Sequence, residues 1–157
     1  QQRDDAAFIA ALNSGVETYP EIDYTVVYTH NDEVVTPNAT SDGSSPLRGG
    51  GTNISNTATQ DVCPTNTAEH LALCTYDPIG FALALDALEN DGPADPSRLP
   101  GASMIAGTSS VCAQVFMPGV NPQTFAQDFS EAGQAISTTV TNAPRVTAET
   151  PLACYAK

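Results

Sequence analysis

Basic side chains are scarce in this sequence of 157 residues. Lysine and arginine together number 5, against 18 aspartates and glutamates, so the formal net charge is −13. Proteins that bind nucleic acids or anionic membranes need clustered lysine and arginine, so we expect neither kind of partner. Long apolar runs are also missing, and none approaches the roughly 20 residues that a membrane span requires. We therefore expect no transmembrane segment.

Metal-binding patterns are absent too. The sequence has no CxxC pair and only two histidines, which makes a zinc site a poor interpretation. It also lacks the D-x-D-x-D-G spacing of a calcium loop. The composition therefore predicts neither a metal site nor a cofactor.

The start of the chain lacks a methionine and a basic-then-apolar signal segment. We expect that further sequence originally preceded Gln1. The chain is 41% hydrophobic and only 15% charged, which is typical of a globular protein rather than a disordered one. Its length suits one domain, or part of one.

Cysteine and asparagine patterns favour a secreted protein. The four cysteines are an even number, which suggests two disulfides, and they allow three pairings. The most economical pairing closes two local segments, with Cys63 bonded to Cys74 and Cys112 bonded to Cys154. Two N-glycosylation sequons begin at Asn38 and Asn53.

Apolar periodicity and turn residues predict few strands. We expect helices over residues 4–14, 78–89 and 124–136, the second with Asp77 as its N-cap and apolar residues on most of its sides. A buried strand is expected over residues 24–29, a short strand over 58–62, and a hairpin over 136–150. Residues 38–56 read as a long surface loop. So few strands predict a sheet that a missing portion completes.

The residues with the clearest chemistry are Asp32, which follows the buried strand, and His70, which lies in a loop before a helix. A serine hydrolase needs a rigidly held acid and a histidine that reaches the nucleophile, and α/β hydrolases carry acid and histidine in this order. Both residues also have ordinary interpretations, as a turn aspartate and a solvated histidine. Asp23 or Glu33 could replace Asp32 as the acid. We interpret His30 as structural.

A nucleophile is not evident. No G-x-S-x-G pentapeptide, which would place serine on a strand-to-helix turn, occurs in the sequence. The nearest segments, 101–105 and 107–109, lie downstream of His70 and so in the wrong order.

Several segments together resemble the C-terminal half of the Candida antarctica lipase B family of fungal lipases. These are Gln1-Gln2 leading to Ala10-Ala11-Leu12, Tyr28-Thr29-His30-Asn31-Asp32-Glu33-Val34-Val35-Thr36-Pro37, Ser45-Pro46-Leu47, and Ala58-Thr59-Gln60-Asp61-Val62-Cys63 leading to Glu69-His70. The similarity covers residues 1–88 and then thins to Cys112, Met117-Pro118 and Cys154. It implies the C-terminal portion of an α/β-hydrolase fold, a parallel sheet with flanking helices, that acts on carboxylic esters.

The resemblance also implies roles for individual residues. Asp32 matches the acid of a Ser-His-Asp triad and His70 matches its base. Other positions match the residues around that triad: Glu69 beside the histidine, Val34 and Val35 in the substrate pocket, and Gln1 or Gln2 near the acyl side of the substrate.

The chain departs from the family pattern in two ways. The family has its nucleophile and oxyanion donors upstream, in a portion that this sequence does not include. It also has a long alanine-rich helix over the active-site mouth, whereas the matching residues 90–110 are short and rich in proline and glycine. We therefore expect a more open mouth.

Our preferred hypothesis is a secreted, glycosylated lipase or esterase made of two chains. Residues 1–89 would form the segment with the triad acid and histidine, and residues 90–157 a lid region and a disulfide-closed extension. An N-terminal chain of the same precursor would supply the serine and the oxyanion hole. The alternative is a non-catalytic, secreted, disulfide-stapled binding or structural domain derived from a hydrolase.

Overall fold

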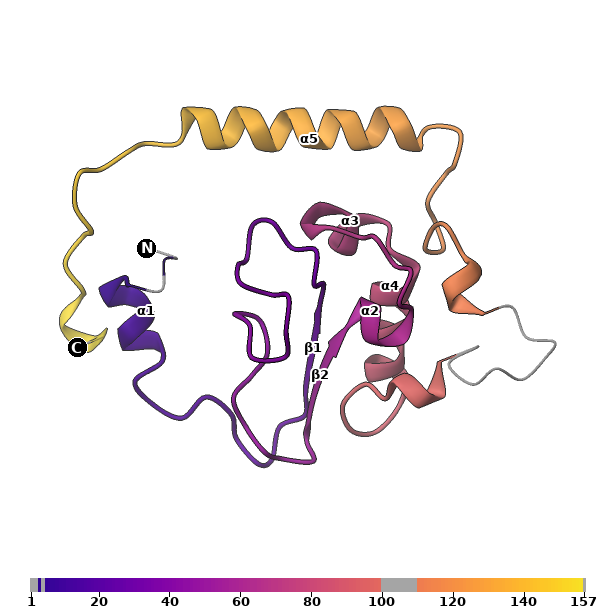
Figure 1. The fold of residues 1–157 in the computed structure, drawn as a ribbon. Helices are drawn as coiled ribbons and strands as arrows, with labels where there is room; N and C mark the ends of the chain where they lie inside the picture. The colour runs from indigo at the N-terminus through magenta and orange to yellow at the C-terminus, as the bar shows by residue number, and fades with distance from the viewer. Residues whose placement is uncertain (1–2, 4, 100–109, 157) are drawn as a thin grey trace. The chain divides into compact units, whose positions relative to one another are not determined.

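The computed structural model describes residues 3, 5–99 and 110–156 of the chain. The chain forms two compact units, Thr18–Val120 and a second that combines Gln1–Glu17 with Asn121–Lys157 (Figure 1). Their boundaries differ from those of the predicted segments 1–89 and 90–157, and that division stays a prediction. Gln1, Gln2 and residues 101–109 lie outside the described residues.

The sheet of the larger unit consists of two parallel strands, β1 (Tyr24–Tyr28) and β2 (Ile54–Ala58), with Tyr24 opposite Ile54. The structure confirms the strand predicted over residues 24–29. The second strand, however, begins within the predicted loop 38–56, which its residues 54–56 overlap. Most residues of this strand are polar and do not by themselves predict a strand. Hydrogen bonds from other segments hold it, since the Asn56 side chain bonds to the backbone N–H and C=O of Leu47.

The strand predicted over residues 58–62 is wrong. Those residues form a short helix, α2 (Thr59–Val62), which begins where β2 ends. The Asp61 carboxylate accepts a hydrogen bond from the Ala58 N–H at 3.3 Å. A carboxylate that binds a free N–H at a helix start favours the helical turn over a longer strand.

Two further helices follow, α3 (His70–Thr75) and α4 (Pro78–Glu89). The Asp77 carboxylate accepts from the Gly80 N–H at 2.7 Å, which confirms the predicted cap. One side of α4 packs into the core through Ile79 and Leu83. The expectation that α4 is buried on most sides is wrong, because Leu88 is 84% exposed.

A partly buried ion pair holds the segment after α4 against that helix. Asp86 lies on α4 and is 8% exposed, and both of its oxygens bind Arg98, at 2.8 and 2.6 Å. Arg98 ends the 3₁₀ helix η1 (Pro96–Arg98). The Asp95 N–H also donates to Asp86. The hydrogen bond from Arg98 lowers the pKa of Asp86, despite the opposing effect of burial.

Both predicted disulfide pairings are wrong. The structure joins Cys63, at the end of α2, to Cys112 in the 3₁₀ helix η2 (Val111–Ala113), with 5.6 Å between their Cα atoms. Cys63 is 2% exposed and belongs to the core cluster together with Val111, so the packing around α4 brings these two segments together. Cys74 and Cys154 are exposed thiols.

The two sequon asparagines are held by hydrogen bonds. Asn38 is 2% exposed, and its amide both donates to the Ser45 hydroxyl and accepts from the Ser45 N–H. The Asn53 amide donates to two backbone carbonyls, those of Tyr19 and Ile22. Burial at Asn38 leaves little room for a glycan in the folded chain. Glycosylation therefore stays a prediction, and Asn53 is the less buried of the two sites.

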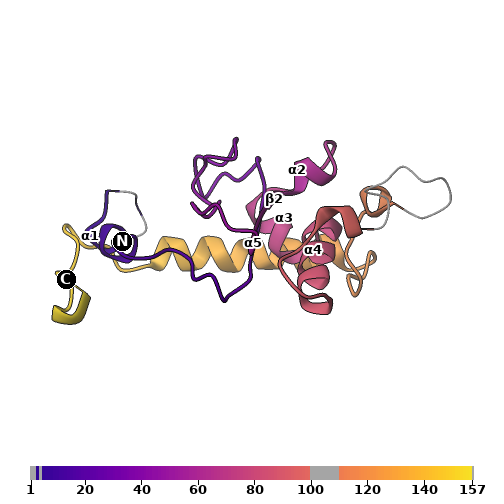
Figure 2. The same cartoon turned by 90° about the horizontal axis from the view of Figure 1, so that it is seen from below.

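The smaller unit contains α1 (Ala7–Leu12), α5 (Phe125–Asn142) and the 3₁₀ helix η3 (Cys154–Ala156) (Figure 2). The Glu149 carboxylate accepts from the Ala7 and Phe8 N–H groups at 2.8 and 2.9 Å, which ties residue 149 to the start of α1. The predicted helix over 124–136 exists but continues to Asn142, so the predicted hairpin over 136–150 is wrong. Within the described part of this region no strand is present.

We predict that non-reducing peptide mapping will recover a Cys63–Cys112 linked peptide pair. Cys74 and Cys154 should react with iodoacetamide before reduction, because both thiols are exposed. Mass spectrometry before and after reduction reads both results. A Cys63–Cys74 peptide would contradict the observed packing of α2 against η2.

Candidate active site

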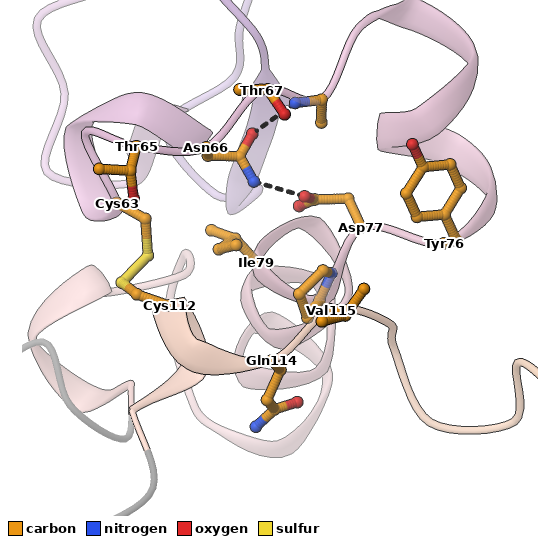
Figure 3. A pocket seen from close by; sticks show the side chains of 12 residues that line it. Cys63, Thr65, Asn66, Thr67, Tyr76, Asp77, Ile79, Cys112, Gln114 and Val115 are labelled. Carbon is orange, nitrogen blue, oxygen red and sulfur yellow. Dashed lines mark hydrogen bonds between the residues drawn. A yellow bond between two sulfur atoms is a disulfide. The ribbon is translucent and has the colours of Figure 1, made fainter. Parts of the chain in front are cut away.

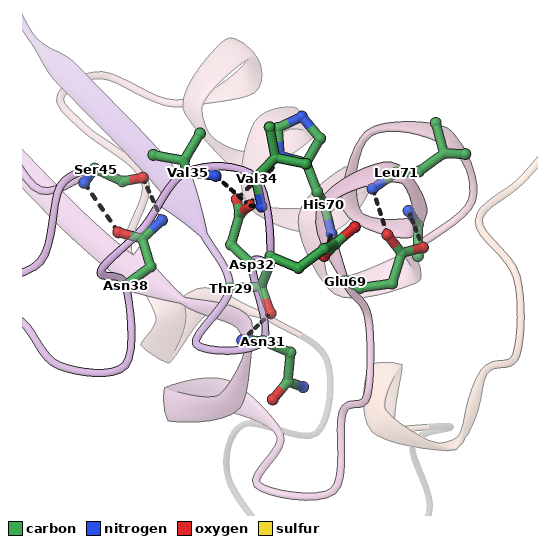
Figure 4. Close-up of polar contacts among 12 residues, drawn as sticks. Thr29, Asn31, Asp32, Val34, Val35, Asn38, Ser45, Glu69, His70 and Leu71 are labelled. Atoms are coloured by element: carbon green, nitrogen blue, oxygen red, sulfur yellow. Dashed lines mark hydrogen bonds and ion pairs between the residues drawn. The ribbon is translucent and has the colours of Figure 1, made fainter. Parts of the chain in front are cut away.

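The two candidate catalytic residues follow strands of one parallel pair. Asp32 lies in the turn after β1, and His70 begins α3, which comes after β2, α2 and a connecting loop. Parallel strands have their carboxyl ends at the same edge of a sheet, which is where α/β proteins place their ligand sites. Figure 4 shows the carboxylate of Asp32 pointing to the imidazole of His70.

The turn after β1 fixes the Asp32 carboxylate. One of its oxygens accepts hydrogen bonds from the backbone N–H groups of Val34 and Val35, at 2.9 and 2.7 Å. Both oxygens lie 3.1 Å from Nδ1 of His70. The Asp32 side chain is 6% exposed, whereas that of His70 is 39% exposed. The backbone thus holds the Asp32 carboxylate, while the His70 imidazole extends toward solvent.

The surroundings of Asp32 favour its ionised form. Burial by itself would raise the pKa of this carboxyl, but the hydrogen bonds from Val35, His70 and Val34 and the charge of His70 together lower it. An ionised carboxylate only accepts hydrogen bonds, so Nδ1 of His70 carries the proton between them. In the neutral imidazole, the ring nitrogen without a proton is then Nε2, on the far side of the ring.

His70 stands at the start of a helix, not in the loop where we expected it. The Glu69 carboxylate is the N-cap of α3 and accepts from the N–H groups of Leu71 and Ala72, at 2.7 and 2.9 Å. The Glu33 carboxylate accepts from the His70 N–H at 3.3 Å. Three N–H groups of the first helical turn therefore have carboxylate partners, which holds the backbone of His70.

The other residues considered for the site differ in what they contact. Val34 and Val35 lie next to the acid and are 63% and 36% exposed. Glu33, an alternative acid, reaches the backbone of His70 and not its ring. His30 contacts the Asn38 carbonyl through Nδ1 and lies 3.6 Å from Asp61 through Nε2, in agreement with a structural role. Gln1 and Gln2 are outside the described residues.

Sequence reasoning missed the buried polar residues beneath this pair. Thr29 is fully buried, and its hydroxyl donates to the Ala68 carbonyl at 2.7 Å. Gln60 on α2 bonds both to Thr29 and to the backbone of Asn66. A threonine at the end of a strand and a glutamine in a short helix carry no local signal of this contact, because their partners are distant in sequence.

A separate cavity of about 300 Å³ lies between the start of α4 and the disulfide (Figure 3). Asp77 and Asn66 line it and are hydrogen-bonded to each other at 2.5 Å. Burial and then the charges of Glu69 and Asp77 raise the pKa of Tyr76, another lining residue. Neither Asp32 nor His70 lines this cavity. The carboxylate that does line it, that of Asp77, already caps α4. We therefore assign the cavity no part in the chemistry.

Among the described residues, no group of three or more histidine, cysteine or acidic side chains could hold a metal ion. Among the same residues, no helix has the length and apolar character needed to span a bilayer.

We predict that Asp32→Asn lowers stability near neutral pH and that the difference from the unaltered protein shrinks in acid. The folded state lowers the pKa of Asp32, so its stabilising contribution is present above the unfolded value, about 3.9, and is lost as pH falls through the lower folded value. Urea unfolding of both proteins at several pH values measures this. A difference that stays constant below pH 4 would contradict it.

Comparison with known proteins supports the fold. No protein-family model matches the chain, and no curated protein matches it. The crystal structure of Aspergillus fumigatus lipase B is similar, with a TM-score of 0.76 and 27% sequence identity over 98% of this chain. The chain spans 36% of the length of that lipase. It therefore has a lipase-like α/β-hydrolase fold over part of such a domain, which supports a hydrolase-like function.

Proposed function

We propose that this chain supplies the acid and the base of a Ser-His-Asp triad in a secreted carboxylic ester hydrolase of the lipase type. The observation that carries the proposal is the contact of both Asp32 oxygens with Nδ1 of His70 at 3.1 Å, in a chain whose fold resembles a lipase. An orienting carboxylate on Nδ1 leaves Nε2 to act as the general base.

The mechanism is acyl transfer. A serine attacks the ester carbonyl while Nε2 of His70 takes the serine proton, and Asp32 stabilises the imidazolium. His70 then protonates the departing alcohol, and the acyl group stays on the serine. Water then attacks the acyl-enzyme with His70 as the base, which releases the carboxylic acid and restores the serine. Val34 and Val35, exposed beside Asp32, would contact the apolar part of the ester.

The serine and the oxyanion hole would come from an N-terminal chain of the same precursor, bound as a heterodimer. Three observations support such a partner. Within the described residues β1 and β2 pair only with each other, so each leaves one edge open. Leu88 on α4 is 84% exposed. The lipase to which the chain is similar is nearly three times as long, since the chain spans only 36% of it.

Secretion is part of the proposal. The Cys63–Cys112 disulfide supports it, because disulfides persist in oxidising compartments. Glycosylation at Asn53 would fit the same compartment, and treatment with a glycosidase that cleaves N-linked glycans would detect it by a change in mass.

A serine-directed phosphonate tests the two-chain arrangement. We expect the native protein to be labelled on a second polypeptide, separate from this chain on a reducing denaturing gel, and this chain to remain unlabelled. The isolated chain should hydrolyse no ester, because loss of the nucleophile costs on the order of a millionfold in turnover. No label and no second chain would instead favour the non-catalytic binding or structural domain.

We further predict that Asp32→Asn lowers kcat for a soluble ester by about ten-thousandfold, because the amide no longer fixes the Nδ1–H tautomer. Replacement of His70 by alanine should lower kcat still more, since it removes the base. Asp23→Asn is the matched control, because Asp23 precedes β1 and is not bonded to His70. Ester hydrolysis in the complete protein measures all three. Full activity of His70→Ala would remove this histidine from the mechanism.

A further inference from the structure

The acid and base of the proposed site come from two segments that are far apart in the sequence, separated by 38 residues. The His70 side chain is 39% exposed, and a contact with one such exposed partner contributes little to holding two segments together. Besides the bond from the His70 N–H to Glu33, other contacts between the segment that leads to Asp32 and the segment that leads to His70 must therefore help to set their separation. The structure contains such contacts directly below the pair.

The first is the hydroxyl of Thr29, three residues before Asp32. It donates to the carbonyl of Ala68, two residues before His70, at 2.7 Å. The same oxygen accepts from the Gln60 amide at 2.9 Å and from the Asn31 N–H at 3.2 Å. A hydroxyl has one proton to donate and two lone pairs, so every hydrogen-bonding position of this fully buried residue is used.

The second is the side-chain amide of Gln60. Its oxygen accepts from the His30 N–H at 2.9 Å, and its nitrogen donates to Thr29 and to the Asn66 carbonyl at 3.3 Å. The amide thus binds the backbone on both sides of the site, at residue 30 after β1 and at residue 66 before α3. Reversing its oxygen and nitrogen would set an amide N–H against the His30 N–H, so the orientation of the side chain is defined.

We propose, on the basis of the proposed function, that Thr29 and Gln60 are positioning residues for the Asp32–His70 pair. Their bonds run mainly to backbone atoms and therefore fix how residues 29–31 lie against residues 66–68. Both catalytic side chains start within three residues of these anchor points. The network centres on the fully buried hydroxyl of Thr29, and a displacement that breaks its bonds would leave this hydroxyl without partners where water does not reach, which favours one geometry.

The test uses Thr29→Val, which keeps the shape of the side chain and removes the hydroxyl, in the complete protein with its partner chain. We expect kcat for a soluble ester to fall by about 10- to 100-fold with little change in KM, since displacements near 1 Å cost rates of this size. Thr29→Ser keeps the hydroxyl and should restore most of kcat. Thr57→Val is the matched control: Thr57 is also a buried threonine, but its hydroxyl is hydrogen-bonded to Ser55, on the same strand.

A second substitution protects the test against misfolding. Gln60→Glu keeps the acceptor for the His30 N–H and removes both donor bonds, and it should also lower kcat with KM nearly unchanged. Gln114→Glu introduces the same charge at an exposed position and should not. Wild-type kcat in a folded Thr29→Val protein would overturn the proposal, and if that variant does not fold, wild-type kcat in Gln60→Glu would do so.

A readout that needs no activity separates this inference from the proposed function. The proton between His70 Nδ1 and Asp32 should give a low-field NMR resonance that is absent in His70→Ala. We expect Thr29→Val to shift or broaden it and Thr57→Val to leave it unchanged. If the unaltered protein neither hydrolyses esters nor reacts with the phosphonate, the proposed function fails. The positioning inference then stands or falls on this resonance, and an unchanged signal in Thr29→Val overturns it.

Discussion

The parallel pairing of β1 with β2 is the constraint on which the site depends. Because both strands point the same way, the residues that follow each of them emerge at the same edge of the sheet. Asp32 follows one strand directly, and the chain after the other passes through α2 and a loop before it reaches His70. An antiparallel arrangement of the same two strands would send these segments to opposite edges. The contact of carboxylate and imidazole is thus a consequence of strand direction.

Strand direction brings the segments near each other, and polar contacts around the buried Thr29 hydroxyl then define their separation. The hydroxyl of Thr29 and the amide of Gln60 bind both segments from below, while the backbone N–H groups of Val34 and Val35 bind Asp32. These N–H bonds have a second effect, since they help to lower the pKa of Asp32 despite its burial. The same set of contacts therefore supports both the geometry and the charge of the acid.

The core of the larger unit is small, and its outer surfaces explain why a partner is part of the proposal. The core cluster has six buried residues, of which Ile79 and Leu83 lie on α4. The Cys63–Cys112 disulfide and the pair of Asp86 with Arg98 close it. Beyond this cluster α4 exposes leucine side chains, and both strands have an open edge within the described chain. A larger α/β-hydrolase sheet would cover such surfaces.

Local signals in the sequence were sufficient to predict several features of the structure. Two of them involve residues that are close together: the β-branched run of β1 and the Asp77-Pro78 start of α4. The third, the order of Asp32 before His70, is a pattern that does not depend on packing. Asp32 and His70 could therefore be named as candidate acid and base without a structure. Their contact through Nδ1 is in agreement with the chemistry that the order suggested.

The remaining features depend on partners that are distant in sequence. Ile54–Ala58 is a strand because β1 lies beside it, and Cys63 bonds to Cys112 because both pack near α4. The helix that replaces the hairpin expected after residue 136 is an exception, because its signal is local: the apolar spacing of α5 continues to Val140. The sequence by itself determined which side chains could perform acid–base chemistry. Only the tertiary structure decided what holds them 3.1 Å apart, because hydrogen bonds and packing between distant segments leave no local pattern.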